Sequence, residues 1–302
     1  MLGYIYLGYF VTRDMEWPLM LGFGSLFLLY AGLFIPSFKK ALFQHKRTFR
    51  YVLFLAIGLR GLLLFTTPNL SDDYFRFVWD GNGIVNGINP FEQKPSEVIF
   101  SENAHDSFLY NEVVEGTSKT FPGGMNSKGY YSVYPPFNQL MFTTASYLAG
   151  DNMQLNIFFL RFFIFLFEIG TLFLLVALLK LFDLSKDKVF IYAFNPLVIV
   201  ELTQNFHFEG VTIFFVLAAV YLLIKQKYMV AGIVYALAIT TKLVPILFLP
   251  LFLFKIPFKR LVVFYSVIGF SVLLFFTPFL GVNLIKTFGV SIRLYFKTFE
   301  FN

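Results

Sequence analysis

The sequence predicts an all-α fold: a multi-pass transmembrane helical bundle of about seven to nine membrane segments, with one large outer loop that carries surface helices. Composition is the first reason, because 57% of the 302 residues are hydrophobic and only 14% are charged, against about 25% charged in soluble domains. The second is that basic residues recur in short turns between apolar runs, as in cytoplasmic loops. The third is a single long polar region, 68–136. We expect one membrane domain over 1–302.

The composition also narrows the chemistry. Cysteine is absent, which excludes disulfides, thiolate metal ligands and a cysteine nucleophile. The net charge is +6 and the isoelectric point is 9.3, but most basic residues fall in turns predicted to be cytoplasmic. The charge therefore reflects membrane topology, and no nucleic-acid partner is expected.

The N-terminal part contains three apolar runs. Residues 1–11 are too few for a full span and predict a partial span or an interfacial lead-in. Residues 17–36 predict a span that ends at Pro36, and 51–67 predict a return to the outer side with Arg60 inside it. The turn between these two spans is predicted to be cytoplasmic because it is strongly basic; it contains Lys39, Lys40, Lys46, Arg47 and Arg50.

The polar region 68–136 is the predicted first outer loop. It holds half of the acidic residues, and loops longer than about 12 to 15 residues are usually functional or disordered. Its aromatic, glycine and proline content, as in FPGG at 121–124 and YPP at 134–136, favours an ordered loop on the membrane surface. The short apolar run 137–149 predicts a re-entrant or surface helix on the outer side.

Six apolar segments alternate between the two membrane faces in the rest of the chain. The Asn195-Pro196 pair predicts a kink in the second, because proline lacks a helix donor. The inner turns contain lysine or arginine, whereas His207, Glu209 and Lys242 fall on the outer side. The segments are 157–181, 189–203, 211–224, 229–241, 244–254 and 261–279.

The stretch that opens the outer loop carries the strongest candidates for chemistry. If it begins as a helix, Asp73, Arg76, Phe77 and Asp80 share one face. Asp72 and Asp73 are predicted to be catalytic, as a general base or as cation ligands; the alternative is a solvated helix start that meets the helix dipole. Arg76 and Asp80 are candidate substrate-binding residues, or a surface ion pair worth about 0.2 to 0.5 kcal/mol.

Further residues of the outer side complete the candidate set. Aromatic side chains such as Trp79 are also typical of an interfacial belt. A lysine at an outer helix end can bind a phosphate as a point charge, or extend harmlessly to the interface. His207 can line a substrate pocket or hydrogen-bond near a helix start. The predicted substrate-binding residues are Arg76, Trp79, Asp80, Tyr134, Glu201, Asn205, His207, Glu209 and Lys242.

Arg161 and Glu168 lie seven residues apart on one predicted span, and therefore on one helix face. A charge inside a bilayer is costly enough that pairing is the default expectation. We predict a structural pair, between these two residues or with Glu201.

Five motifs follow one another in a distinctive order: SDDYFRFVWDG, GINPF, VYPPFNQL, NPLVIVELTQNFHFEG and TTKLVPILFLP. This ordered set resembles the GT-C superfamily of integral-membrane glycosyltransferases, and within it bacterial mannosyltransferase-like members that use polyprenyl-phosphate sugars. The resemblance covers roughly residues 4–250. The chain stops at Asn302 with fewer helices than is usual in the superfamily, so we expect a fragment or a minimal member.

The resemblance implies transfer of a hexose, mannose, from a polyprenyl-phosphate-linked donor to a hydroxyl of a glycan or glycolipid acceptor. It implies that the first large outer loop carries the catalytic aspartate, which matches the pair Asp72 and Asp73. The donor phosphate would suit Lys242 and Arg76. The segment around His207 would line the donor or acceptor pocket.

The resemblance also implies a location, the bacterial inner membrane, with the active site on the periplasmic face and in contact with membrane lipid. No cofactor is expected, because the lipid phosphate is already a good leaving group, and a divalent cation is optional. A different class stays open: a carrier or flippase for lipid-linked saccharides, or a non-catalytic membrane subunit. Transporters place polar sites near the bilayer midplane in repeated halves, whereas these polar clusters fall at outer helix ends.

Overall fold

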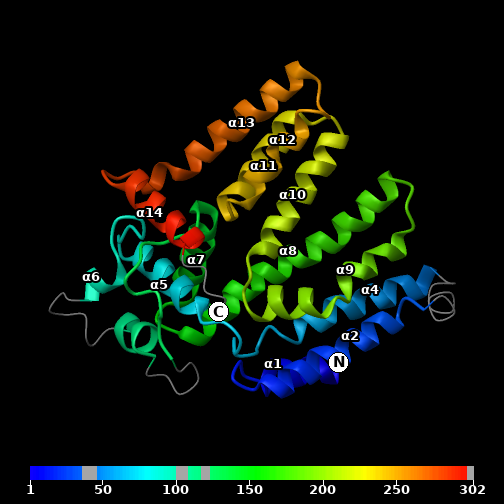
Figure 1. Cartoon of the computed structure of the whole chain (residues 1–302), viewed down its shortest axis with the longest axis horizontal. Coiled ribbons are helices and arrows are strands. Elements are labelled where there is room, and N and C mark those ends of the chain that lie inside the picture. Colours follow the sequence, from blue (N-terminus) through cyan, green and yellow to red (C-terminus); the bar gives the residue numbers. More distant parts are fainter. Residues whose placement is uncertain (36–45, 100–107, 117–122, 298–302) are drawn as a thin grey trace. The chain divides into compact units, whose positions relative to one another are not determined.

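The computed structural model of the chain consists of helices and their connections (Figure 1). The all-α prediction is confirmed, because no β-strand occurs in the part of the chain that the structure describes, which is 1–35, 46–99, 108–116 and 123–297. The chain divides into two compact units. Unit 1 comprises Met1–Ser71 and Arg161–Gly210, and unit 2 comprises Asp72–Leu160 and Val211–Asn302.

Unit 1 is assembled from two separate stretches of sequence. Its long helices are rich in leucine and other good helix formers, and Pro18 stands in the first turn of α2, where its missing N–H has no helical partner. Its elements are α1 (Leu2–Tyr9), α2 (Glu16–Gly32), α4 (Lys46–Gly61), most of α8 (Met153–Leu181), the 3₁₀ turn η2 (Lys186–Lys188), α9 (Val189–Ala193) and the π-helix η3 (Val198–Gln204).

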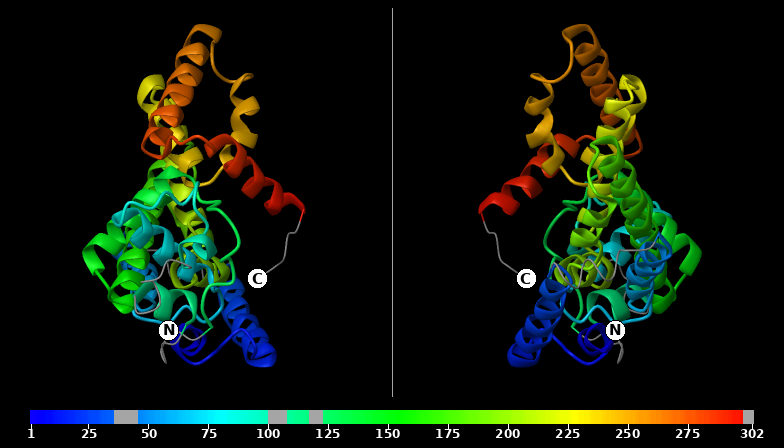
Figure 2. Two further views of the ribbon diagram at one scale, coloured as in Figure 1. Left: turned by 90° about the vertical axis from the view of Figure 1, so that its left-hand side faces the viewer. Right: turned by 90° about the vertical axis from the view of Figure 1, so that its right-hand side faces the viewer.

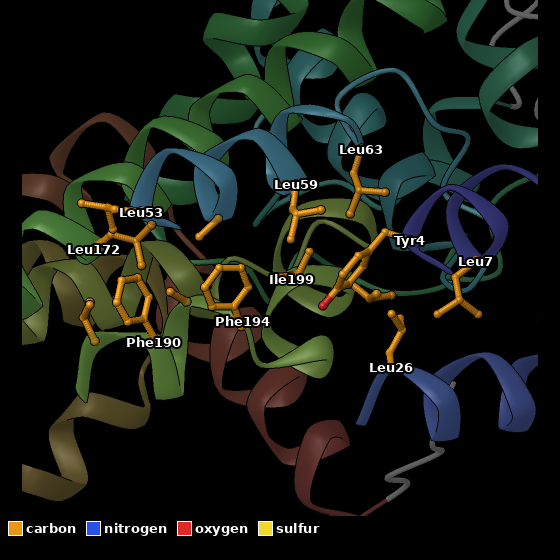
Figure 3. Packing of buried hydrophobic residues seen from close by; sticks show 14 of the residues in the cluster. Tyr4, Leu7, Leu26, Leu53, Leu59, Leu63, Leu172, Phe190, Phe194 and Ile199 are labelled. Carbon is orange, nitrogen blue, oxygen red and sulfur yellow. The ribbon is translucent and has the colours of Figure 1, made fainter. Parts of the chain in front are cut away.

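A buried apolar cluster forms the core of unit 1 (Figure 3). In this cluster the rings of Phe190 and Phe194 lie near Leu53 and Ile199. Close packing of α1 on α2 depends on Gly22, because a Cβ atom there would lie 2.5 Å from the side chain of Leu7. The core thus joins helices from both stretches of the unit.

Unit 2 contains the predicted outer loop and the C-terminal helices. Helices α5 and α7 pack against each other, and so do α11 and α13 (Figures 1 and 2). Its elements are α5 (Asp73–Val85), α6 (Pro95–Ile99), the π-helix η1 (Leu109–Val114), α7 (Pro136–Ala149), most of α10 (Glu209–Ile224), α11 (Tyr228–Thr241), the 3₁₀ turn η4 (Val244–Phe248), α12 (Leu249–Phe252), α13 (Phe258–Phe276), the 3₁₀ turn η5 (Thr277–Phe279) and α14 (Leu284–Lys297).

The second apolar cluster lies between α11 and α13. The ring of Tyr235 meets the rings of Phe252 and Phe264 edge-on, with centroids 5.4 and 5.9 Å apart. Its hydroxyl donates a hydrogen bond of 2.7 Å to the carbonyl of Pro245. Burial of the phenol is therefore compensated by a partner, as buried tyrosines require.

Two of the described helices have the length and hydropathy of membrane spans: α8, with 29 residues, and Phe258–Phe279, with 22. A third counts if Val198–Gln204 and Glu209–Ile224, which are sharply bent at a short break, form one broken span. These apolar helices indicate a membrane protein. Other predicted spans form shorter helices, such as α2 with 17 residues, whereas a span needs about 20. The larger count of seven to nine segments stays a prediction.

Two predictions concerned the turns. The kink at Asn195-Pro196 is confirmed, because α9 ends at Ala193 and Asn195 Oδ1 accepts hydrogen bonds from the N–H groups of Leu197 and Val198 at 3.0 and 3.4 Å. These bonds satisfy donors at the start of η3, as a helix cap does.

Two other predicted features lie outside the described residues. They are the span end and basic turn at Pro36, Lys39 and Lys40, and Phe121-Pro122 of the outer loop.

Candidate functional site

Helix α5 begins directly after Asp72, where the sequence predicts a helix start. Asp72 occupies the N-cap position, but its side chain makes no capping hydrogen bond. Asp72 and Asp73 are both half-buried, at a helix end whose dipole favours negative charge. The helix ends where Gly87, with a φ of 80°, lets the N–H of Ile88 donate to the carbonyl of Gly83 at 2.8 Å.

Arg76 and Asp80 form an ion pair one turn apart on α5. Arg76 Nε donates to Asp80 Oδ1 at 2.7 Å. Arg76 Nη1 donates to the carbonyls of Tyr130 at 2.8 Å and Ser127 at 3.2 Å. The predicted i, i+4 pair is present, but the surface location is wrong, because the two residues are only 4% and 1% exposed. The carbonyls of the outer loop favour this burial by accepting hydrogen bonds from Nη1 of the guanidinium group.

The second carboxylate oxygen of Asp80 binds the far end of the outer loop. Ser132 Oγ and Gln139 Nε2 both donate to Asp80 Oδ2, the latter at 3.0 Å. Gln139 Nε2 also lies 3.1 Å from the carbonyl of Tyr134. We call Arg76, Asp80, Ser132 and Gln139 the Asp80 network. It joins α5 to the loop before α7 and to the first turn of α7.

A second set of polar contacts joins α5 to α7 further along both helices. Ser146 Oγ accepts hydrogen bonds from Asn82 Nδ2 at 3.1 Å and from Asn156 Nδ2 at 2.9 Å. Gly81 permits this close approach, because a Cβ atom there would lie 2.3 Å from the carbonyl oxygen of Phe142. The two helices are therefore held together at two levels.

The two aromatic candidates of unit 2 have different surroundings. Trp79 is only 3% exposed, so its assignment to an interfacial belt is wrong. Tyr134 is half-buried, and its ring meets Phe77 and Phe142 edge-on with centroids 4.9 and 5.6 Å apart. The Tyr134 ring therefore contributes to the packing of α5 on α7.

In unit 1, Glu201 brings together two of the other candidates. Asn205 Nδ2 donates to Glu201 Oε2 at 3.1 Å, and His207 Nδ1 lies 3.5 Å from the same oxygen. The backbone between them has an unusual turn, since Phe206 has a φ of 61°, a rare value for a bulky residue. The turn lets His207 approach the carboxylate at position 201. Glu209 begins α10.

The predicted pairing of Arg161 with Glu168 or Glu201 is wrong. Seven helical residues separate the first two by about 10 Å along the axis, and each finds nearer partners on other elements. Arg161 is fully buried, and its guanidinium lies 4.5 Å from the centroid of the Phe206 ring. It donates to four backbone carbonyls, those of Leu64 at 3.0 Å, Thr66 at 2.5 Å, Thr203 at 3.1 Å and Gln204 at 2.9 Å.

Glu168 pairs with Arg60 instead. Arg60 Nε donates to Glu168 Oε2 at 3.0 Å, and both side chains are fully buried. Arg60 Nη1 donates to the carbonyls of Ala56 at 3.1 Å and Ala193 at 2.8 Å, while Tyr192 donates to Glu168 Oε1 at 2.6 Å. Arg60 therefore faces the interior of unit 1 and does not extend to the interface.

The eleven candidate residues are divided between the units. The structure brings Arg76 and Asp80 into direct contact in unit 2, and Glu201, Asn205 and His207 together in unit 1. Lys242 follows α11 and is half-buried. Sequence reasoning missed Ser132 and Gln139, although Gln139 lies inside the VYPPFNQL motif and signalled a polar residue on an apolar helix.

Metal-ligating side chains do not gather in groups of three or more anywhere in the described residues. The carboxylates of the Asp80 network and of the Arg60 pair already accept hydrogen bonds from cations or amides.

Comparison with known proteins relates the chain to one family. The family model described as alpha-(1→6)-mannopyranosyltransferase, N-terminal domain, matches residues 17–256. No curated protein and no solved structure matches the chain. The match contains all five ordered motifs and all eleven candidate residues, and it confirms the resemblance to GT-C enzymes. The chain therefore belongs to the alpha-(1→6)-mannopyranosyltransferase family of GT-C-type mannosyltransferases.

Proposed function

We propose that this protein transfers a mannosyl group from a polyprenyl-phosphate-linked donor to a hydroxyl group of a glycan or glycolipid acceptor. The observation that carries the proposal is the family match over residues 17–256. The linkage in the family's description implies that the nucleophile is the 6-hydroxyl of an acceptor sugar and that the product has the α configuration.

In the proposed step, Asp72 or Asp73 acts as the general base. The acceptor oxygen forms a bond to the anomeric carbon and gives its proton to the carboxylate. The bond between the anomeric carbon and the phosphate oxygen breaks, and the lipid phosphate leaves with the electron pair. One feature supports this role: Asp72 and Asp73 are both half-buried, whereas the residues that follow them on α5 are buried. A base must reach within about 2.6 to 3.2 Å of the hydroxyl.

Lys242 is the first candidate for the donor phosphate, because a lysine at a predicted outer helix end can bind a phosphate as a point charge. Arg76 is the second candidate, and its Nε and Nη1 atoms bind Asp80 and two loop carbonyls. Lys242 stands half-buried after the end of α11, and an ammonium group stabilises the charge that develops on a leaving phosphate. Trp79, Tyr134, Glu201, Asn205, His207 and Glu209 stay candidate substrate-binding residues.

We further propose that the chain is a multi-pass protein of the bacterial inner membrane, with about seven to nine membrane segments, and that it acts on the periplasmic face. The support is the distribution of charge along the sequence. Lysine and arginine recur in the predicted inner turns, whereas Asp72, Asp73 and Lys242 fall in the predicted outer turns. A polyprenyl donor, whose lipid tail lies in the bilayer, suits such a location.

Transfer is tested with the purified chain in liposomes, a polyprenyl-phosphate donor carrying labelled mannose, and an α-(1→6)-linked oligomannoside acceptor. We expect labelled, lengthened oligomannoside. Replacement of the base, by Asp72→Asn or Asp73→Asn, should lower kcat by about 10² to 10⁴-fold. Glu97→Gln is the matched control, because it removes an exposed carboxylate of the same outer loop, paired with Lys94 at 3.3 Å.

Two outcomes would overturn the proposal. Full activity in both aspartate variants would remove the acidic pair from the chemistry. Movement of an intact lipid-linked saccharide across the liposome membrane, with no consumption of donor, would instead favour the carrier function.

A further inference from the structure

The acidic start of α5 lies one turn from the Asp80 network. Arg76 follows Asp72 by four residues and Asp73 by three, so all three side chains belong to one side of the helix. Asp80 is one turn further on. Because a helix turn is a rigid unit with a rise of about 5.4 Å, the contacts of Arg76 and Asp80 also fix where the two carboxylates stand.

The Asp80 carboxylate is held from three directions, all within unit 2. Arg76 Nε binds one oxygen at 2.7 Å, and Ser132 Oγ and Gln139 Nε2 bind the other. Asp80, Ser132 and Gln139 are each at most 1% exposed. Hydrogen bonds to a buried charge are among the stronger ones, so this arrangement fixes the orientation of α5 firmly.

We propose that Asp80 is a positioning residue for the transfer reaction, and that Ser132 and Gln139, which hold its carboxylate, share this role. The inference rests on the proposed function, since it concerns the placement of the general base. It assigns to Asp80 and Arg76 a task other than substrate binding, and it adds two residues to the machinery.

The geometry favours positioning over substrate contact. Both oxygens of Asp80 are already used, and so are Arg76 Nε and Nη1; Arg76 Nη2 is buried and has no hydrogen-bond partner among the described residues. The two Asp80 oxygens and Arg76 Nε and Nη1 are therefore already engaged within unit 2. Placement matters greatly for a base, because a displacement of about 1 Å can cost 10²-fold in rate.

The test compares two serines that are matched in burial and chemistry. Ser132 and Ser146 are each 1% exposed, and each makes buried hydrogen bonds that hold α5. Ser132 binds Asp80, close to the acidic start, whereas Ser146 binds Asn82 and Asn156. We therefore measure kcat, the KM of donor and acceptor, and the melting temperature for Ser132→Ala, Ser146→Ala and Gln139→Ala.

Positioning predicts that Ser132→Ala and Gln139→Ala lower kcat by about tenfold or more with KM changed by less than about twofold. Ser146→Ala should lower the melting temperature by about as much as Ser132→Ala does, but it should change kcat by less than about twofold. The double variant Ser132→Ala/Gln139→Ala should lose less activity than the product of the two single losses, because both residues act through one carboxylate.

Three results would overturn the inference. A raised KM with normal kcat in Ser132→Ala would indicate that Asp80 binds substrate. If Ser132→Ala and Ser146→Ala lost kcat equally, in proportion to their loss of melting temperature, the Asp80 network would have only a stabilising role. Unchanged kcat in both Ser132→Ala and Gln139→Ala would remove the network from the reaction. Absence of transfer by the wild-type protein, by contrast, defeats the proposed function itself, and the inference with it.

Discussion

The two units bury arginine in different ways. In unit 2, Arg76 pairs with Asp80 through Nε, and its Nη1 donates hydrogen bonds to two loop carbonyls. In unit 1, Arg161 has no carboxylate within ion-pair distance among the described residues, and four backbone carbonyls and the Phe206 ring surround it. Carbonyl dipoles and an aromatic ring can thus solvate a buried guanidinium without a carboxylate.

The difference matters for what each arginine holds. Arg161 binds the carbonyls of Thr203 and Gln204, the last residues of η3, which a helix end leaves without helical partners. It thereby supports the turn that contains Phe206 and leads to His207. Arg76 instead supports a carboxylate, whose own contacts reach the start of α7. One arginine stabilises a bent backbone, and the other stabilises a network of side chains.

The largest expected effect is at Arg161. Arg161→Met would leave four carbonyls without a donor, at about 1.5 to 3 kcal/mol for each hydrogen bond to a charged group, which is comparable to the whole stability of a domain. We expect little folded protein in membranes, measured as the monodisperse fraction after detergent extraction. Arg161→Lys should recover only part, because an ammonium group cannot reproduce the planar fork. Normal yield of Arg161→Met would refute the carbonyl account.

The Arg60–Glu168 pair adds a third kind of burial within unit 1, with one charge of each sign. Arg60→Met or Glu168→Gln alone should cost about 3 to 5 kcal/mol, because each leaves its partner buried and uncompensated. The double variant should cost less than the sum of the single variants. Thermal unfolding of the three detergent-solubilised variants measures this, and strictly additive losses would show that the pair is not coupled.

Arg76→Lys tests the same principle in unit 2. It keeps the charge but loses the fork that reaches both Asp80 and the loop carbonyls, so we expect a loss of about 2 kcal/mol. Trp79 offers a local probe, since it is 3% exposed whereas Trp17 is 72% exposed. In a Trp17→Phe background, the emission of Trp79 should shift to the red at a lower temperature in Arg76→Lys. An unchanged transition would mean that the fork is unimportant.

The smallest effect is expected where an ion pair is exposed. The N–H of Lys94 donates to Glu97 at 3.0 Å, and this backbone hydrogen bond, together with the Lys94 ammonium, lowers the pKa of Glu97. A lowered pKa means that the stabilising contribution exists above the unfolded pKa and disappears as the pH falls through the folded one. Glu97→Gln should shift the melting temperature by less than about 2 °C at pH 7. A larger shift would overturn the contrast between buried and exposed pairs.

Local patterns in the sequence predicted local structure well. The start of α5 at Asp73, the kink beside Pro196 and the helix after Pro135 follow from signals within a few residues of each position. The i, i+4 spacing of Arg76 and Asp80 likewise indicated their contact. These features depend on backbone geometry, which nearby residues determine.

Partners that are distant in sequence were not predictable in the same way. Arg161 and Glu168 looked like a pair because they share a helix face, yet the carbonyls and the arginine that bind them come from other elements. Ser132 and Gln139 reach Asp80 across 52 and 59 positions, and only the packing of α5 on α7 brings them there. The burial of Arg76, Asp80 and Trp79 was missed for the same reason, since no local signal shows which side of α5 is covered.

The contacts of Arg161 also bear on the order in which the protein folds. The carbonyls of Leu64 and Thr66 lie 97 and 95 positions before Arg161, and those of Thr203 and Gln204 lie 42 and 43 positions after it. Translation runs from the N-terminus, and domains generally fold as units as they emerge. The side chains of the Asp80 network are all present once Gln139 has been synthesised. The contacts of Arg161 in unit 1 cannot be completed until Gln204 has been synthesised. The segment that carries the acidic pair can therefore assemble while the N-terminal helices are still without their closing partners.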